Sequence, residues 1–225
     1  MPSGPLIGVP AVIGTVKRLR PRRVLDIGVG TGKWGFLLRE QTDLEHERRR
    51  SEWELTIDGI EGYAPYIGDH QRAVYDNIYI ADALVWLADY EGERYDVALA
   101  LDIIEHFDPA NALRFAGDAL RVADTLFVTT PKRYFAQTSE DNPLQFHRSW
   151  WPRSALANLA ARLDANVQVT QTVTTNIAVF ARGRKPPKVD TDVLLNVVSA
   201  LRDRLVPELA YYRLRSRTGP TLDAP

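Results

Sequence analysis

Short apolar runs alternate with longer segments of mixed polarity through the first two thirds of the chain. The apolar runs have the length and composition of β-strands, and they cover residues 24–27, 55–60, 77–81, 95–101 and 124–130. The intervening and following segments predict helices over residues 33–42, 66–75, 83–89, 109–122 and 152–163. Because the strands are apolar throughout, we expect a parallel sheet with both faces covered.

The pattern changes after the last of these helices, where two strand-like segments follow each other directly. Residues 166–173 and 176–183 are separated only by Thr174 and Thr175, which is too short a connection for a helical crossover. They therefore predict an antiparallel hairpin. The expected fold class is α/β: a doubly wound, mostly parallel seven-stranded sheet with an antiparallel C-terminal hairpin, helices on both faces and an extra C-terminal helix.

The chain is expected to have two parts. Residues 1–185 would form one domain, an N-terminal helix followed by a core over residues 24–183, and residues 186–225 would form a helical extension and tail. The polar insert at residues 41–54 predicts a helix end followed by a surface loop. Residues 190–205 predict an amphipathic helix, suited to pack on the domain or to form a homodimer, with an apolar stripe of Val193, Leu194, Val197, Val198, Leu201 and Leu205.

The composition excludes several kinds of chemistry. The 225 residues include no cysteine, so a disulfide framework, a thiolate nucleophile and a thiolate metal site are all excluded. No apolar run approaches the roughly 18–20 residues of a membrane span, and we expect a cytoplasmic protein with no membrane partner. The 28 basic residues nearly balance the 29 acidic ones, which argues against a nucleic-acid partner because phosphate binding normally requires an excess of positive charge.

A glycine-rich turn follows the first predicted strand and leads directly into a helix. Gly28, Gly30 and Gly32 permit a sharp turn and a close approach of the backbone to a ligand, with helix amides facing that ligand. The spacing does not fit the phosphate loop GxxxxGK[ST], nor does it supply the third glycine of the dinucleotide motif GxGxxG. A tight turn with no ligand stays an alternative.

Three acidic residues follow the next strands. Glu61, Asp82 and Asp102 come at the carboxyl ends of the second, third and fourth predicted strands, the edge at which open α/β sheets bind ligands. The carboxylate of Glu61 could accept hydrogen bonds from both hydroxyls of a ribose. Each acid alone could instead cap a helix. Together with the glycine turn, they favour a nucleoside site.

These segments resemble the class I S-adenosylmethionine-dependent methyltransferases, a Rossmann-like family. VLDIGVGTG looks like the first motif of the family, IDGIEGY like its ribose-binding motif, YIADAL like its adenine-contacting motif, and YDVALALDIIEHF like its fourth motif. The resemblance spans residues 24–183, departing from the family in the charged insert and in the helix after Pro187. It implies the cofactor S-adenosyl-L-methionine and these cofactor-binding residues: Asp26, Gly28, Gly30, Gly32, Trp34, Glu61, Gly62, Asp82, Ala83, Asp102 and Ile103.

Methyl transfer from a sulfonium is an in-line displacement, in which alignment of the reactants can supply about 7–11 kcal/mol. An acceptor that holds a proton also benefits from a base. His106 follows the fourth strand and His147 lies in the connection after the fifth, so both are candidate catalytic residues. His106 could instead cap or pack a loop.

The connection after the fifth strand is rich in aromatic residues. It could form a wall against a planar or cationic acceptor, and the expected substrate-binding residues there are Tyr134, Phe146, Trp150 and Trp151. The alternative is that the adjacent tryptophans anchor the next helix to the sheet.

No metal site is expected. Glu105, His106, Asp108 and His147 have suitable chemistry, but no His-x-x-x-His or similar spacing places two ligands on one face. The expected function is transfer of a methyl group from S-adenosylmethionine to an O or N atom of a small-molecule acceptor. The alternatives are an RNA or protein methyltransferase and a non-catalytic assembly protein that binds the cofactor.

Overall fold

The computed structural model describes residues 8–137 and 142–191. The chain divides into two units after Val189, and the fold below is that of the first unit. The amphipathic helix predicted over residues 190–205 and the tail after it lie outside the described residues, apart from Asp190 and Thr191. The domain boundary predicted after residue 185 and the homodimer predicted through that helix therefore stay predictions.

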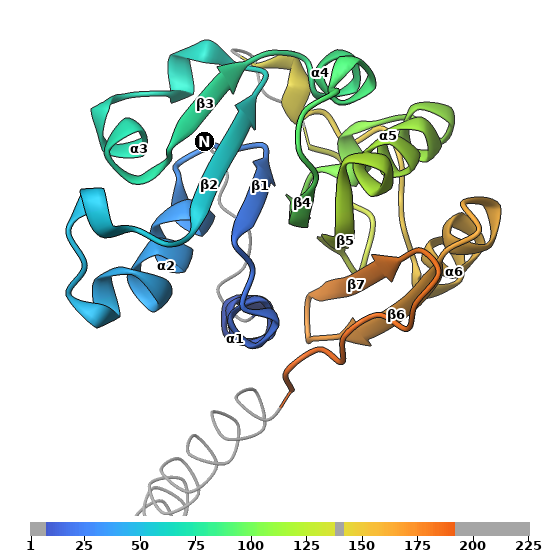
Figure 1. Cartoon of the computed structure of the whole chain (residues 1–225). Helices are drawn as coiled ribbons and strands as arrows, with labels where there is room; N and C mark the ends of the chain where they lie inside the picture. The colour runs from blue at the N-terminus through green and yellow to red at the C-terminus, as the bar shows by residue number, and fades with distance from the viewer. Residues whose placement is uncertain (1–7, 138–141, 192–225) are drawn as a thin grey trace, which may run out of the picture. The chain divides into compact units, whose positions relative to one another are not determined.

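The described strands form one seven-stranded sheet in the order β3-β2-β1-β4-β5-β7-β6 (Figure 1). Strand β7 runs antiparallel to both of its neighbours, β5 and β6, and the other pairings are parallel. This arrangement confirms the predicted fold class. The strands are β1 Arg23–Ile27, β2 Thr56–Glu61, β3 Asn77–Ile80, β4 Tyr95–Leu101, β5 Ala123–Pro131, β6 Asn166–Gln171 and β7 Thr175–Ala181.

Helices cover both faces of the sheet, α1 to α3 on one and α4 to α6 on the other (Figure 1). Asp82 and Asp108 cap the N-termini of α4 and α5, each accepting from two backbone N–H groups. Proline at the first position of α5 also has the φ angle that a helix needs. The helices are α1 Val9–Leu19, α2 Lys33–Thr42, α3 Asp69–Val74, α4 Ala83–Asp89, α5 Pro109–Val122 and α6 Arg153–Arg162.

The central strands are buried on both faces. Every residue of β7 is buried, as is all of β4 except Asp96, whereas the edge strand β3 is largely exposed and the edge strand β6 is mostly half-buried. In β5, Leu126 and Val128 join the core beneath α5 and α6, and Phe127 between them points to the opposite face. Burial on both faces explains why apolar runs without alternation predicted these strands.

One predicted helix begins three residues too early. Residues 66–75 were expected to be helical throughout, but Ala64–Tyr66 form a separate 3-10 turn and α3 begins only at Asp69. Gly68 between them is extended, with φ −125° and ψ −167°, and the side chain of Gln71 accepts from its N–H. The backbone therefore leaves the helical conformation at Gly68, although the hydrophobic pattern of a helix continues through this position.

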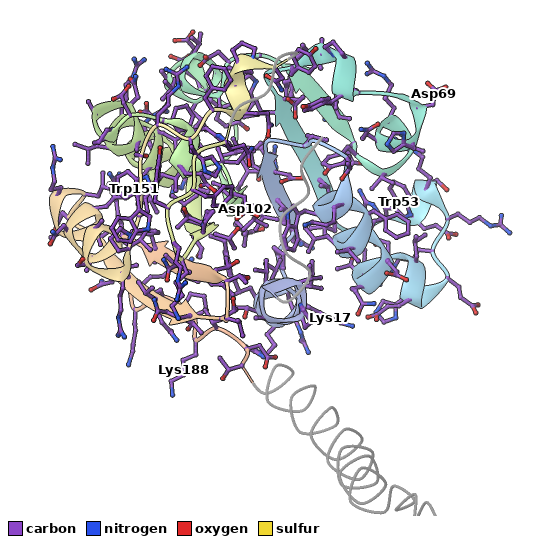
Figure 2. All side chains as sticks on the ribbon, turned by 180° about the vertical axis from the view of Figure 1, so that it is seen from behind. Lys17, Trp53, Asp69, Asp102, Trp151 and Lys188 are labelled. Carbon is purple, nitrogen blue, oxygen red and sulfur yellow. The ribbon has the colours of Figure 1, made fainter. Side chains whose placement is uncertain are left out.

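The charged insert after α2 is anchored more firmly than a surface loop would be. Asp43, expected at the surface, is completely buried, because its carboxylate pairs with Arg39 at 2.6 Å and accepts from the backbone N–H of Glu54. The guanidinium of Arg39 in turn stacks on the ring of Trp53, 3.8 Å from its centroid (Figure 2). The rest of the insert is mostly exposed, as expected.

Within residues 8–137 and 142–191, no helix combines the length and apolar character needed to cross a membrane. The predicted cytoplasmic location stays a prediction.

Candidate active site

A cavity of about 640 Å³ opens at the carboxyl ends of the parallel strands. Its walls come from the turns that follow β1, β2, β3, β4 and β5. The order of strands reverses between β1 and β4, and the crevice at such a reversal is where open α/β sheets bind ligands. The volume falls within the roughly 300–1,000 Å³ of typical small-molecule sites.

The glycine turn forms one wall of this cavity and requires glycine at its first position. Gly28 has φ +86°, and a Cβ atom on it would lie only 2.2 Å from Cδ1 of Ile103, which follows β4. The N–H groups of Gly28 and Val29 both donate to the carbonyl of Ile60 on β2. The turn therefore packs against β4 on one side and is tied to β2 on the other.

Two side chains hold the glycine turn from below. One oxygen of Glu61 accepts from the N–H of Gly30 at 2.8 Å, and its other oxygen accepts from the N–H of Tyr63 at 2.8 Å. Gln71 donates to the carbonyl of Gly30 at 2.8 Å without lining the cavity. Since a carboxylate has about four acceptor positions, Glu61 keeps acceptor capacity directed at the cavity.

Asp26 lies beneath the turn and does not line the cavity. Its carboxylate is buried and accepts from the hydroxyl of Tyr75 at 2.5 Å, and that hydroxyl accepts from the N–H of Gly35 in α2. Burial raises the pKa of Asp26 to about 7, and the charge of Glu61 adds to the rise, whereas Tyr75 and Lys33 oppose it. Asp26 thus supports the turn from below.

Asp82 and Asp102 both line the cavity. Asp82 caps α4 through one oxygen, Oδ1, at 2.8 and 3.2 Å, which is the alternative role, and its contact with a ligand stays a prediction. Asp102 has φ +59° and accepts from the hydroxyl of Thr129 at 3.0 Å. Burial raises the pKa of Asp102. The hydrogen bond from Thr129 and the ammonium of Lys33 partly oppose this rise.

Two histidines meet at the other end of the cavity. The rings of His106 and His147 have centroids 5.1 Å apart, and both residues line the cavity. Nδ1 of His106 contacts the carbonyl of Phe146 at 3.2 Å, and Nδ1 of His147 contacts the carbonyl of Phe135 at 2.9 Å. A carbonyl only accepts, so both rings carry a proton on Nδ1. Burial lowers the pKa of His106, which favours its neutral form.

Glu105, which the sequence offered only as a possible metal ligand, lies beside these histidines. Its carboxyl group is buried, 2% exposed, and neither oxygen makes a well-formed hydrogen bond among the described residues. Burial and the nearby charge of Asp102 raise the pKa of Glu105 well above its usual range. The sequence signal that could have found it is its place in the turn Ile104–His106, directly before a candidate histidine.

The residues expected to bind the cofactor fall into two groups. Asp26 and Gly32 do not line the cavity, since Asp26 lies beneath the turn and Gly32 caps α2. The others line one continuous wall: Gly28, Gly30, Trp34, Glu61, Gly62, Asp82, Ala83, Asp102 and Ile103.

The four aromatic side chains expected to bind the acceptor do not line the cavity. Tyr134 and Trp150 are half exposed on the outer surface. Trp151 packs into the core beside α6 (Figure 2) and donates to the hydroxyl of Ser149, which favours the anchoring alternative. Phe146 contributes only its carbonyl, to His106.

Other residues of the same connection line the cavity instead. They include Phe135, Gln137, Leu144 and Arg148. An aromatic pattern picks out Phe135 but not the polar Gln137 or the charged Arg148. Lys33, at the start of α2, is a further cation at the cavity wall, and burial lowers its pKa.

A mixed seven-stranded sheet of this order, with a cavity at its switch point, defines a Rossmann-like methyltransferase. The model of the methyltransferase domain family matches residues 11–170 of this chain. The chain belongs to this family and is an S-adenosylmethionine-dependent methyltransferase. No curated protein matches the chain in sequence.

Solved structures share the fold at low sequence identity. An O-methyltransferase family protein from Burkholderia thailandensis has a TM-score of 0.57 and 16% identity over 80% of this chain, which spans 56% of that protein. The N-terminal domain of EvdMO1, with SAH and D-fucose, has a TM-score of 0.57, 16% identity and coverage of 81% and 85%. Magnesium protoporphyrin IX methyltransferase from Synechocystis PCC 6803, with bound SAM, has a TM-score of 0.51, 17% identity and coverage of 78% and 77%.

Proposed function

We propose that this protein transfers the methyl group of S-adenosylmethionine to an oxygen or nitrogen atom of a small-molecule acceptor. The observation that carries the proposal is one continuous cavity, whose first end is the glycine turn with Glu61 and whose second end is the pair of imidazoles. A nucleoside-binding end and a proton-accepting end in one enclosure suit a methyl donor and a protic acceptor.

The first end supports the cofactor in three parts. The glycine turn and the ammonium of Lys33 suit the carboxylate of the methionine moiety, because both offer positive charge or donors. Glu61 suits the ribose hydroxyls, and Asp82 with Ala83 suits the adenine. The sulfonium would then lie near Asp102 and Ile103, where the two ends of the cavity meet.

The second end supports acceptor chemistry. A lone pair of the acceptor would form the new bond to the methyl carbon while the carbon–sulfur bond breaks, and its electron pair stays on sulfur in S-adenosylhomocysteine. The acceptor's proton would leave to a base, and Nε2 of His106 or of His147, when the ring is neutral, holds a lone pair at that place. The likeness to an O-methyltransferase and to a small-molecule methyltransferase agrees with this class of acceptor.

The placement of the ribose is tested with Glu61→Gln. Because a hydrogen bond to a charged group contributes about 1.5–3 kcal/mol, we expect affinity for S-adenosylhomocysteine to fall about tenfold to a hundredfold, measured by calorimetry. The matched control is Gln71→Met, which removes another tie to Gly30 without touching the cavity wall. Equal losses in both variants would show that Glu61 acts only by holding the turn, and unchanged affinity in Glu61→Gln would refute the placement.

A further inference from the structure

Three groups that commonly bind metals converge at the acceptor end of the cavity, although they come from two distant segments. One ligand atom each from Glu105, His106 and His147 lies within 4.8 Å of the other two. Ligand atoms about 2.1 Å from one tetrahedral ion are about 3.4 Å apart, so the side chains would have to rotate towards one another to bind the ion. No spacing in the sequence indicated this, because His147 is 41 residues beyond His106.

The carboxyl group of Glu105 lacks the partner that a buried charge requires. It is 2% exposed, it lines the cavity, and neither of its oxygens makes a well-formed hydrogen bond among the described residues, although the hydroxyl of Thr130 lies nearby. An unpaired buried carboxylate is strongly disfavoured unless it is neutralised or coordinates a cation. A divalent ion beside it would supply the missing partner, and the carboxylate of Asp102 adds negative charge nearby.

Both imidazoles are already oriented as metal ligands. Each donates Nδ1–H to a backbone carbonyl, His106 to Phe146 and His147 to Phe135, so Nε2 is the nitrogen that would bind a metal. Histidines that bind metals almost always donate their other ring N–H in this way, because the second contact fixes the tautomer and the ring orientation.

Backbone hydrogen bonds hold the two segments in register. The carbonyl of Glu105 accepts from the N–H of Arg148 at 2.8 Å and from that of Ser149 at 3.1 Å. The hydroxyl of Ser149 also donates to the carbonyl of Phe107 at 2.6 Å. The residue next to His147 is thus bonded directly to the residue that carries the carboxylate, so the three ligands are held together by the fold.

We propose that Glu105, His106 and His147 bind a divalent first-row transition ion at the acceptor end of the cavity. Two imidazoles and one carboxylate suit Zn²⁺, Co²⁺, Fe²⁺ or Mn²⁺, and three protein ligands leave coordination positions open towards the cavity. The positive guanidinium of Arg148 also lines this region and repels a cation. The ion therefore binds only if its attraction to the carboxylates exceeds this repulsion.

The role of the ion rests on the proposed function. An acceptor hydroxyl bound to the ion would lose its proton to water more readily, and its oxygen would then attack the methyl carbon as the carbon–sulfur bond breaks. The histidines would act as ligands in that case and not as bases. Acceptors with an oxygen that can bind a metal, such as a sugar or phenol hydroxyl, are the class that this arrangement selects.

The proposal is tested with the full chain after treatment with a chelator. Titration with Co²⁺, followed by visible absorbance, should show one bound ion per chain with nitrogen ligation, displaced by Zn²⁺. Glu105→Gln and His147→Gln should each weaken Co²⁺ binding by at least about tenfold. The matched control, His46→Gln, replaces a histidine that is exposed on the insert and should bind Co²⁺ as the parent does.

Calorimetry with S-adenosylhomocysteine on the same samples separates this proposal from the proposed function. Two results would overturn the metal site alone if cofactor binding is normal. The first is that the parent shows no saturable Co²⁺ binding, and the second is that Glu105→Gln and His147→Gln bind Co²⁺ as the parent does. Circular dichroism identifies a misfolded variant. Glu105→Gln replaces a buried carboxyl group that makes no well-formed hydrogen bond among the described residues, so it should fold about as stably as the parent without metal. A structural role for the carboxyl group predicts a loss of stability instead.

Discussion

At the scale of single residues, two carboxylates at the ends of neighbouring strands have different surroundings. Glu61 ends β2 and reaches the cavity, while Asp26 on β1 lies beneath the glycine turn and bonds to Tyr75. Their positions along the chain alone predicted the same kind of role for both. The hydrophobic pattern indicated parallel strands, and so it placed both carboxylates near one edge of the sheet. It could not indicate the contact of Asp26 with a tyrosine 49 residues away.

The raised pKa of Asp26 predicts a dependence of stability on pH. Its pKa rises from 3.8 to about 7 on folding, so between these values the folded protein binds more protons than the unfolded chain, and the free energy of unfolding falls as pH increases. Asp26→Asn should remove this part of the decline, measured by urea unfolding across the window. Tyr75→Phe, which lacks the hydrogen bond that opposes the shift, should extend the decline to higher pH. Parallel curves for parent and Asp26→Asn would contradict the assignment.

At the scale of elements, sequence patterns located strands better than the connections between them. The apolar runs predicted all seven strands and the hairpin, and burial on both faces leaves a local signal in the central strands. We expected aromatic side chains of the long connection after β5 to bind the acceptor, but most of the residues of this connection that line the cavity are polar. Which side of a loop faces a cavity depends on contacts such as those of Glu105 with Arg148, which have no period in the sequence.

The packing of α2 on α3 and β3 can be tested at Gly35. Glycine to alanine in a helix normally stabilises by up to about 1 kcal/mol. At Gly35, however, the added Cβ would lie 2.3 Å from Cζ of Tyr75, whose ring is held by Asp26. We therefore expect Gly35→Ala to lower the free energy of unfolding by about 1–3 kcal/mol, measured with urea.

The matched control is Gly117→Ala in α5, where the added Cβ would meet only the end of Leu163, at 3.3 Å. Its cost should be clearly smaller. A gain of stability in Gly35→Ala would show that Tyr75 is not held in place.

At the scale of the whole molecule, every part of the described site belongs to the first unit of the chain. The described residues that line the cavity lie between Ile27 and Thr175, and the sheet ends at Ala181. Lys188 and Val189 still belong to this unit, since the carbonyl of Lys188 accepts from Arg18 and Val189 is buried.

A chain that ends at Asp190 should therefore fold and bind S-adenosylhomocysteine as the full chain does. Calorimetry measures the affinity, and light scattering measures the mass of both proteins. If the apolar stripe of residues 193–205 forms a homodimer, the full chain will be a dimer and the shortened chain a monomer. A monomeric full chain would dispose of the homodimer, and lost cofactor binding in the shortened chain would refute the independence of the first unit.

The contact between Gly28 and Ile103 has a consequence for how the two ligands influence each other. The turn that would receive the cofactor and the segment that leads to the histidines share this one point of packing. A cofactor that moves Gly28 would also move Ile103 and change the affinity for the acceptor. Thermodynamic linkage requires the acceptor to change the cofactor's affinity by the same factor, so the two dissociation constants should vary together.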